Sequence, residues 1–265
     1  MGISFPFEFT TISKSTFEGC SSLSYIMIGK LIETKKIKEI FVSSYSKIQK
    51  IVVLSLTKMI IDNAFEGCSS LKFIVLPYGI TSIGHFVFSD CSSLTHVTIP
   101  SSVTSIRGDS FSGCSSLEKI DVNSGHFSNY QSDGILYDVN IKTLVICPQG
   151  RKNISILNRI SRIDDYAFFG CQSITTITLP VTVTTIGQYA FSGCSSLTSI
   201  SIPNSVTSFG EYAFSECSSL KSFTFPKSVI TIGDCIFEGC DSLKKIMIPR
   251  SFRSTFGDHQ ILQYY

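Results

Sequence analysis

The sequence contains little charge and no long apolar run. Charged residues make up 16% of the 265 residues, and the formal net charge at pH 7 is +2. A balance this close to neutral provides no general attraction to nucleic acid or to a membrane surface. A membrane-spanning helix needs ~18 consecutive apolar residues, and the longest apolar runs, such as Ile51–Leu56, are far shorter. The sequence therefore predicts no transmembrane segment and no nucleic-acid partner.

Targeting, catalytic and metal-binding signals are also missing. The first residues lack the basic start, long apolar core and small-residue cleavage site of a secretory signal, so the sequence alone predicts a cytoplasmic protein. The four histidines occupy unrelated positions, and neither a phosphate-binding loop nor a nucleophile elbow is present. No paired Cys-x-x-Cys units supply zinc ligands. We therefore expect no enzymatic activity, no metal and no cofactor.

What the sequence does contain is a repeat with a period of 23 residues, which is clearest at Cys171, Cys194, Cys217 and Cys240. Counting from each cysteine as zero, apolar residues recur at +3, +6, +8, +12, +15 and +20, with proline often at +9 and glycine often at +16. A fixed period of this length predicts a solenoid, whose coils bury a core only against their neighbours. The same register gives ten coil starts: Cys20, Tyr45, Cys68, Cys91, Cys114, Pro148, Cys171, Cys194, Cys217 and Cys240.

Within each coil the pattern predicts two short extended segments and a turn. Inward positions +6 and +8 alternate with outward positions +5 and +7, as in a β-strand, and proline at +9 ends that strand because it has no N–H to donate. A second extended piece covers +12 to +16, where glycine lets the chain turn, and the segment that leads to the next cysteine indicates a short helical turn. The expected architecture is a right-handed superhelix of about ten 23-residue coils. It has a parallel β-sheet on one face, and short strands and helical turns on the other.

Two coils are longer than the period. The coil from Cys20 to Tyr45 has 25 residues, which places two extra residues within Lys30–Glu39. The coil from Cys114 to Pro148 has 34 residues, an excess of 11. Its segments 134–140 and 144–146 predict short strands around a turn, so we expect a β-hairpin or an enlarged coil at about 123–147. Otherwise the chain is predicted to be a single solenoid domain over 1–265.

The recurrent pattern resembles the BspA-type leucine-rich repeats: Cys-Ser-Ser-Leu-x-x-Ile-x-Ile-Pro, followed by Val-x-x-Ile-Gly and Ala-Phe. The likeness extends over nearly all of residues 3–252, and the long coil resembles an enlarged coil common in that family. Members are often cell-surface or secreted proteins linked to adhesion and host-protein binding. The resemblance therefore implies a leucine-rich-repeat solenoid with an adhesion role at the cell surface. The cytoplasmic location expected from the missing leader is the alternative.

The register also predicts two inner columns of side chains. Cysteines at position zero should form a ladder of small buried thiols, because equivalent side chains of stacked coils point the same way and do not face one another as a disulfide requires. These cysteines are Cys20, Cys68, Cys91, Cys114, Cys171, Cys194, Cys217 and Cys240. Phenylalanines at +20 should form the second ladder: Phe17, Phe65, Phe88, Phe111, Phe168, Phe191, Phe214 and Phe237.

The outward positions +5 and +7 form one continuous surface, on which we place the candidate site. Its first half carries large apolar and charged side chains, whereas its second half is nearly all serine and threonine. Grouped exposed apolar side chains mark partner sites on soluble proteins, although β-favouring residues are also tolerated on a broad sheet face. The candidate partner-binding residues are Tyr25, Met27, Lys50, Val52, Phe73, Val75, His96, Lys119 and Asp121.

These observations favour a non-enzymatic scaffold that binds a protein partner, such as a host or extracellular matrix protein. The alternative function is an intracellular scaffold or a regulatory subunit of a signalling complex. The ends of the solenoid suggest a further contact, because a terminal rung exposes apolar side chains unless it is capped. Either the terminal residues fold back, or two chains meet end to end as a homo-oligomer. The terminal residues in question are Ile3, Phe5, Thr255, Phe256, Ile261 and Leu262.

Overall fold

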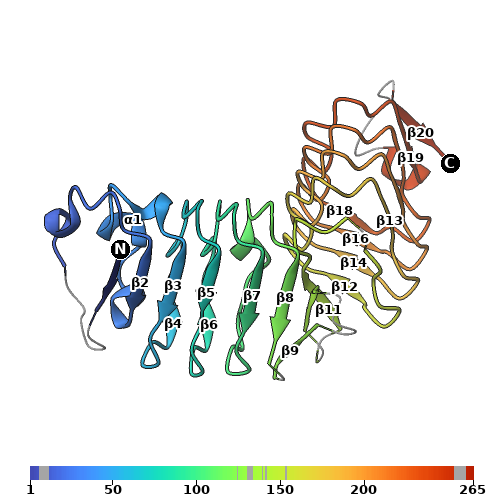
Figure 1. Ribbon diagram of the computed structural model, residues 1–265. Helices are drawn as coiled ribbons and strands as arrows, with labels where there is room; N and C mark the ends of the chain where they lie inside the picture. The colour runs from blue at the N-terminus through green and yellow to red at the C-terminus, as the bar shows by residue number, and fades with distance from the viewer. Residues whose placement is uncertain are drawn as a thin grey trace. The chain divides into compact units, whose positions relative to one another are not determined.

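The computed structural model describes residues 1–5, 12–123, 125–129, 134–138, 140, 142–152, 154–253 and 261–265. They form two compact units (Figure 1), which we call unit 1 (Met1–Asn140 with Pro148–Gly150) and unit 2 (Ile141–Cys147 with Arg151–Tyr265). Each unit is a stack of β-solenoid coils, as the repeat predicts. The single domain over 1–265 stays a prediction. Thr255, Phe256 and His259 lie outside the described residues.

In unit 1 the +5 to +8 segments are parallel strands. They are β1 (Gly2–Ser4), β2 (Tyr25–Ile28), β3 (Lys50–Val53), β5 (Phe73–Val75), β7 (His96–Ile99) and β8 (Lys119–Val122). The first four make one hydrogen-bonded sheet, and β7 pairs separately with β8, as can be followed from blue to green in Figure 1. Isoleucines at +6 are partners from strand to strand of the first sheet: Ile3, Ile26, Ile51 and Ile74. The predicted register is confirmed.

In unit 2 the same segments are β13 (Thr176–Thr178), β15 (Ser199–Ser201), β17 (Ser222–Thr224) and β19 (Lys245–Ile248), followed by β20 (Leu262–Tyr264). β13 pairs with β15, whereas β17, β19 and β20 form a second parallel sheet. Leu262 lies opposite Ile246 in that sheet, so residues 262–264 fold back as one more rung. Of the two alternatives for this end of the solenoid, the structure has the fold-back. Association of two chains stays a prediction.

A second column of short strands stacks along each unit. Unit 1 contains β4 (Met59–Ile60) parallel to β6 (Ser82–Ile83), and an isolated bridge continues the column from Ser82 to Ser105. Unit 2 contains β11 (Thr143–Ile146), β12 (Arg162–Ile163), β14 (Thr185–Ile186), β16 (Ser208–Phe209) and β18 (Thr231–Ile232). These five strands pair in order and in parallel. Their +15 side chains point into the core, and all of them except Ile232 are buried.

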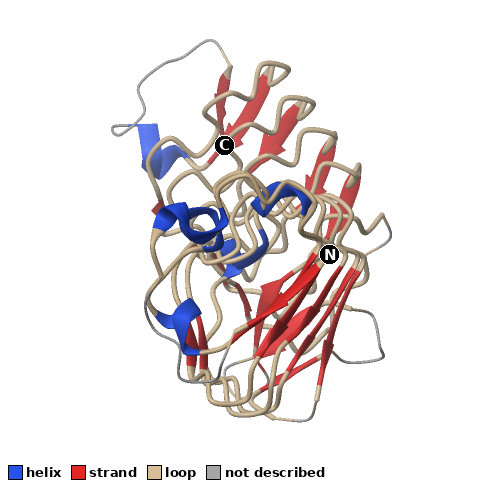
Figure 2. Ribbon diagram, turned by 60° about the vertical axis from the view of Figure 1, so that its left-hand side comes forward, coloured by secondary structure: helices blue, strands red, loops and turns tan. Residues whose placement is uncertain are grey.

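Helical structure is sparse, as Figure 2 shows in blue. In the described residues it includes the 3-10 helices η1 (Lys14–Phe17), η2 (Lys30–Glu33), η3 (Tyr45–Lys47), η4 (Gly108–Phe111) and η6 (Arg250–Phe252), and the α-helical turn α1 (Ile37–Ile40). η2 and α1 occupy the longer coil that follows Cys20. In most of the regular coils, hydrogen-bonded turns take the place of a helix, whereas the coil from Tyr45 contains η3 and the coil from Cys91 contains η4. For example, Tyr212 has a φ of 55° and donates its N–H to the carbonyl oxygen of Asp234 in the next coil.

Glycine at +16 permits a close approach between coils. A Cβ at Gly210 would lie 2.4 Å from the backbone nitrogen of Gln188, and a Cβ at Gly233 would lie 2.3 Å from that of Glu211. Neither glycine has a positive φ, so position +16 requires glycine because a Cβ would not fit there, and not because the backbone is left-handed. The sequence identified the position correctly, but the physical reason is contact with the preceding coil.

The phenylalanine column is confirmed as buried from Phe65 to Phe214, whereas its end members Phe17 and Phe237 are half-buried. The ring of Phe88 stacks 5.5 Å from that of Phe65, and Phe191 stacks 4.8 Å from Phe168 and 5.2 Å from Phe214. These five side chains are fully buried. A buried phenylalanine contributes ~1.5–3 kcal/mol by leaving water, and the repeated stacking makes each coil depend on its neighbours.

The cysteine column is buried from Cys68 onward, whereas Cys20 is exposed. The burial expected at Cys20 is therefore wrong, because Cys20 stands on the first rung of the column and one side of it is left uncovered. The buried thiols are more than small apolar groups. Cys194 Sγ donates a hydrogen bond to the carbonyl oxygen of Phe168 at 3.2 Å, and Cys240 Sγ donates one to that of Phe214 at 3.0 Å. Each thiol thus satisfies a buried carbonyl of the preceding coil.

The enlarged coil contains three short strands. β10 (Leu136–Asp138) and β11 coincide with the two segments in which the sequence predicts strands. β9 (Phe127–Ser128) was missed, and it pairs antiparallel with β10, with Tyr137 opposite Ser128. Residues 130–133 and 139 lie outside the described residues.

Candidate functional site

Six of the nine candidate residues lie on one sheet of unit 1. Tyr25, Lys50 and Phe73 are register partners on β2, β3 and β5, and so are Met27, Val52 and Val75. We call this set of six the apolar face. Phe73 is 63% exposed and Val75 49% exposed, while Tyr25, Met27 and Val52 are half-buried. The intervening residues Ile26 and Ile51 are fully buried, so the predicted alternation between inside and outside holds.

One residue of the apolar face partly covers another. The ammonium group of Lys50 lies 5.5 Å from the centre of the Tyr25 ring, which is within the range of a cation–π contact. Lys50 therefore contributes its alkyl chain and its charge over Tyr25. The uncovered apolar surface is concentrated on β5, at Phe73 and Val75.

The other three candidates form a polar cluster on β7 and β8. Lys119 Nζ lies 2.9 Å from one carboxylate oxygen of Asp121, and His96 Nε2 lies 3.3 Å from the other. Asn129, which follows β9, donates to Asp121 at 2.9 Å. Burial acts to raise the pKa of Asp121, but the hydrogen bond and charge of Lys119, with His96 and Asn129, lower it overall. The carboxylate therefore stays ionised and keeps the four side chains (His96, Lys119, Asp121 and Asn129) together.

The structure thus divides the candidates into two groups. β5 and β7 come from consecutive coils but belong to different hydrogen-bonded sheets. Sequence reasoning missed Asn129, because its contact with Asp121 depends on the path of the enlarged coil. It also missed Tyr78, which is 78% exposed in the turn after β5. An aromatic residue at +10, a turn position that Asn204 and Lys227 occupy in later coils, was the available signal.

The histidines do not assemble into one site. His85 Nδ1 lies 2.7 Å from Asp109 Oδ2, and His126 Nε2 lies 2.8 Å from Asp138 Oδ2. With His96, every histidine of the described residues pairs with a different aspartate. Within that part of the chain there is no group of three or more histidine, cysteine or acidic residues that could hold a metal ion. Nor is any helix there long and apolar enough to cross a membrane.

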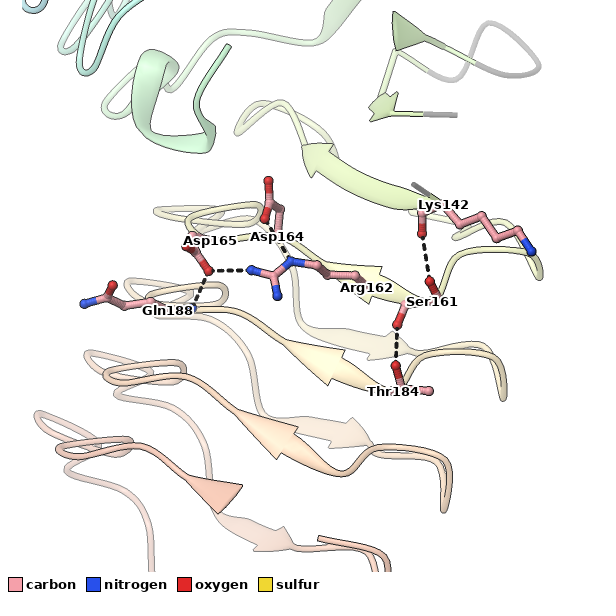
Figure 3. Close-up of polar contacts among 7 residues, drawn as sticks. All are labelled: Lys142, Ser161, Arg162, Asp164, Asp165, Thr184 and Gln188. Atoms are coloured by element: carbon pink, nitrogen blue, oxygen red, sulfur yellow. Dashed lines mark hydrogen bonds and ion pairs between the residues drawn. The ribbon is translucent and has the colours of Figure 1, made fainter. Parts of the chain in front are cut away.

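Unit 2 uses many polar side chains to connect coils (Figure 3). Arg162 contacts Asp164 and Asp165, each at 3.0 Å, and Asp165 also accepts the backbone N–H of Gln188 in the next coil at 2.9 Å. Thr184 donates to the carbonyl oxygen of Ser161 at 3.1 Å. These polar groups satisfy one another, so this part of the surface offers few free groups to a partner.

Comparisons with known proteins identify the repeat. The chain matches the family model described as "BspA type Leucine rich repeat region (6 copies)" over residues 2–117, 35–152 and 147–259. It is similar to the pneumococcal vaccine antigen PcpA, with 21% identity and a TM-score of 0.70, covering 100% of this chain and 73% of that one.

Two further solved structures have the same fold. A leucine-rich repeat protein from Eubacterium ventriosum is 25% identical, with a TM-score of 0.69 and coverage of 94% of this chain and 72% of that one. A leucine rich cell surface protein from Faecalibacterium prausnitzii is 23% identical, with a TM-score of 0.60 and coverage of 99% and 86%. Comparison with curated proteins gives no match.

Proposed function

The chain belongs to the BspA-type leucine-rich repeat family, and on that premise we propose that it is a non-enzymatic scaffold that binds another protein in adhesion. The contact surface is the apolar face of β2, β3 and β5, bordered by the polar cluster of β7 and β8. Stacked coils present such side chains on a rigid sheet, which lowers the entropy lost when a partner binds.

The observation that carries this proposal is the exposure of Phe73 and Val75 on β5. They stand side by side with the half-buried Met27 and Val52, and Tyr78 follows in the next turn. A soluble protein rarely keeps a contiguous apolar patch in water unless something covers it. Aromatic residues at the centre of a patch are typical anchors of protein interfaces.

The polar cluster supports the same assignment. Protein interfaces surround an apolar centre with polar and charged groups that fix orientation. Lys119 and Asp121 are held in place by each other and by Asn129, so they are preorganised for such contacts. Their partly exposed position makes them contributors to specificity and association rate more than to affinity.

The test is a pull-down that compares the parent chain with Phe73→Ser/Val75→Ser. Losing an interface anchor costs about 2 kcal/mol or more, so recovery of the partner should fall by about 30-fold. Val181→Ser is the matched control, because Val181 is 79% exposed, belongs to unit 2 and is not part of the apolar face. Both variants alter exposed side chains and should melt as the parent does. Equal recovery with the parent and the double variant would rule out the apolar face as the contact surface.

The proposed role in adhesion is tested by determining whether the protein lies outside its source cells. One similar structure is described as a cell surface protein and another as a vaccine antigen, and both descriptions support a site of action outside the cell. Brief protease treatment of intact source cells should therefore remove the chain. Survival of the chain in intact cells, with loss only after lysis, would discard adhesion and leave an internal protein-binding role.

A further inference from the structure

A hollow interrupts the strand face of unit 2. β15 pairs only with β13, and β17 belongs to the sheet with β19 and β20, so the hydrogen-bonded ladder stops between β15 and β17. A cavity of about 660 Å³ lies at this break, lined by residues of β15 and β17, by the turns that follow them, by Met247 and by Tyr265. This volume is within the ~300–1,000 Å³ typical of small-molecule sites.

The break exposes part of the core. Ile200 and Ile202, the +6 and +8 residues of their coil, are half-buried and line the hollow. Their counterparts in the two neighbouring coils are buried: Ile177, Leu179, Phe223 and Phe225. Among the described rungs from β13 to β19, this one alone has both inward aliphatic side chains partly accessible.

The core composition changes at this break. The coil of β17 carries phenylalanine at both +6 and +8, where the repeat usually has isoleucine. The Phe223 ring lies 4.9 Å from Phe225 and 5.0 Å from Phe214, and Phe225 lies 5.1 Å from Phe209. Rings of this size need more room than isoleucine, and overfilling a core shifts the backbone. The larger rings of this cluster accompany the break between β15 and β17.

The walls of the hollow carry hydroxyl groups that are not used by the fold. Some threonine hydroxyls of unit 2 bond to the preceding coil, as Thr198 does to the carbonyl oxygen of Thr175 at 3.0 Å. Four lining residues have no such bond in the described part of the chain: Ser199, Ser201, Ser222 and Thr224. Each hydroxyl offers one donor and two acceptor positions. Their positions repeat in the register of the coils, so the hollow presents a fixed set of unpaired polar groups.

The rim adds an aromatic ring and little charge. Tyr265 is half-buried, and its phenol donates to the carbonyl oxygen of Phe225, which fixes the ring at the edge of the hollow. Asn204 adds an amide, and Lys227 is the one charged residue among those that line the hollow. A divalent cation would need several carboxylates, and no carboxylate side chain is among the residues that line it. A saccharide matches the lining, because a sugar ring has an apolar C–H face and a periphery of hydroxyl groups.

We propose that the hollow between β15 and β17 binds a saccharide residue of a glycan. The C–H face of the sugar rests on Ile200 and Ile202, and its hydroxyl groups exchange hydrogen bonds with Ser201, Ser222 and Thr224. Tyr265 closes one end of the site. This site belongs to unit 2 and shares no residue with the apolar face, so it is independent of the proposed protein-binding function.

The experiment is saturation-transfer NMR on the full chain. The probes are the methyl glycosides of glucose, galactose, N-acetylglucosamine and N-acetylneuraminic acid, each added separately. At least one probe should receive saturation, and its ring C–H protons should receive the most, because they lie on the aliphatic floor. Absence of transfer to all four probes overturns the proposal.

Two substitutions locate the binding. Thr224→Val removes a hydroxyl of the hollow and keeps the side-chain shape, whereas Thr178→Val makes the same change at the equivalent +7 position of β13, outside the hollow. Loss of one hydrogen bond weakens binding by about 3–10-fold, so Thr224→Val should weaken the responding probe by that factor and Thr178→Val should not. Ser201→Ala provides a second variant with the same expectation. Equal weakening by Thr178→Val and Thr224→Val refutes the site.

A further variant separates this proposal from the protein-binding one. Phe73→Ser/Val75→Ser alters unit 1 alone and should leave the affinity for the sugar unchanged. Loss of sugar binding in that variant would place the sugar outside the hollow and overturn the inference.

Discussion

Units 1 and 2 have the same kinds of side chain in their inner columns and different side chains on their outer faces. Position +6 points inward at Ile51 and at Ile177, and the +20 rings stack in the same way at Phe88 and Phe191. The outward +5 position, by contrast, is Phe73 on β5, which is 63% exposed, and Thr176 on β13. The same repeat therefore carries an apolar outer surface in unit 1 and a hydroxyl-rich outer surface in unit 2.

This difference shows which positions specify the fold and which remain available for binding. The inner residues are fixed because every coil must fit the one beneath it, and packing to native density tolerates little change in volume. Outward residues of a strand contact only their lateral neighbours and the solvent. Their chemistry can change from coil to coil at little cost in stability. Substitutions at equivalent positions of the two units test this separation.

The largest effect is expected in the ring column. Phe88→Ala in unit 1 and Phe191→Ala in unit 2 each remove a fully buried ring that stacks on two others, at 5.5 and 4.9 Å for Phe88 and at 4.8 and 5.2 Å for Phe191. Each substitution should lower the free energy of unfolding by about 3–5 kcal/mol, as measured by urea denaturation. An unchanged melting temperature for Phe191→Ala would mean that the register is wrong.

Phe73→Ala is the control for this comparison. It removes the same kind of ring from an exposed position, so its effect should stay within about 0.5 kcal/mol of zero. A penalty as large as that of Phe88→Ala would show that the outer face of unit 1 also contributes to the fold. The separation between inner and outer positions would then fail.

A smaller effect is expected at the +16 glycines, where the two units differ in detail. An added Cβ at Gly210 meets the backbone of Gln188 at 2.4 Å, whereas at Gly84 its nearest neighbour, at 2.3 Å, is the side-chain carboxylate of Asp62, and the nearest backbone atom lies 2.9 Å away. Gly210→Ala should therefore destabilise by about 1–3 kcal/mol through displaced backbone, and Gly84→Ala by less. Urea denaturation of both variants measures the difference. A larger penalty at Gly84 would contradict this account of the coil contacts.

The sequence predicted the inner columns well because they depend on the period alone. Ile177 inside and Thr176 outside follow from counting, and so does Phe73 on the apolar face. The hollow could not be predicted in this way, since the pattern treats phenylalanine and isoleucine as equivalent apolar residues. Its outline follows from the break between β15 and β17, which the spacing of apolar residues does not reveal.

Other misses have a similar origin. Asn129 reaches Asp121 only because the enlarged coil returns along β8, and a residue count does not contain that path. The thiol hydrogen bond of Cys194 depends on the direction of one carbonyl group, which is set by the turns of the preceding coil. Local spacing therefore determines which side chains enter the core, while contacts between irregular segments require coordinates.

The smallest expected effect concerns the cysteine column and pH. Burial raises the pKa of Cys68 from 9.0 to about 12. The pKa of Cys217 in unit 2 is also raised, and the largest cause is its hydrogen bond with Cys194. The unfolded chain ionises these thiols at their ordinary pKa, whereas the folded chain keeps them protonated. The stability that these protonated thiols contribute is thus fully present below pH 9 and is lost as the pH rises toward 12.

At pH 10 the free energy of unfolding should be lower by about 1 kcal/mol for a thiol whose pKa is raised as that of Cys68 is. Urea denaturation at pH 8 and pH 10 measures it, with Cys68→Ala as the comparison. The variant is less stable at pH 8, because it lacks the packing of the thiol, but it should lose less stability between the two pH values. Exposed Cys20 and Cys235 should react quickly with a thiol reagent at pH 8, while Cys68 and Cys217 should not. Rapid reaction of Cys68 would contradict the protected column, because a thiol that exchanges with water has no reason to keep a raised pKa.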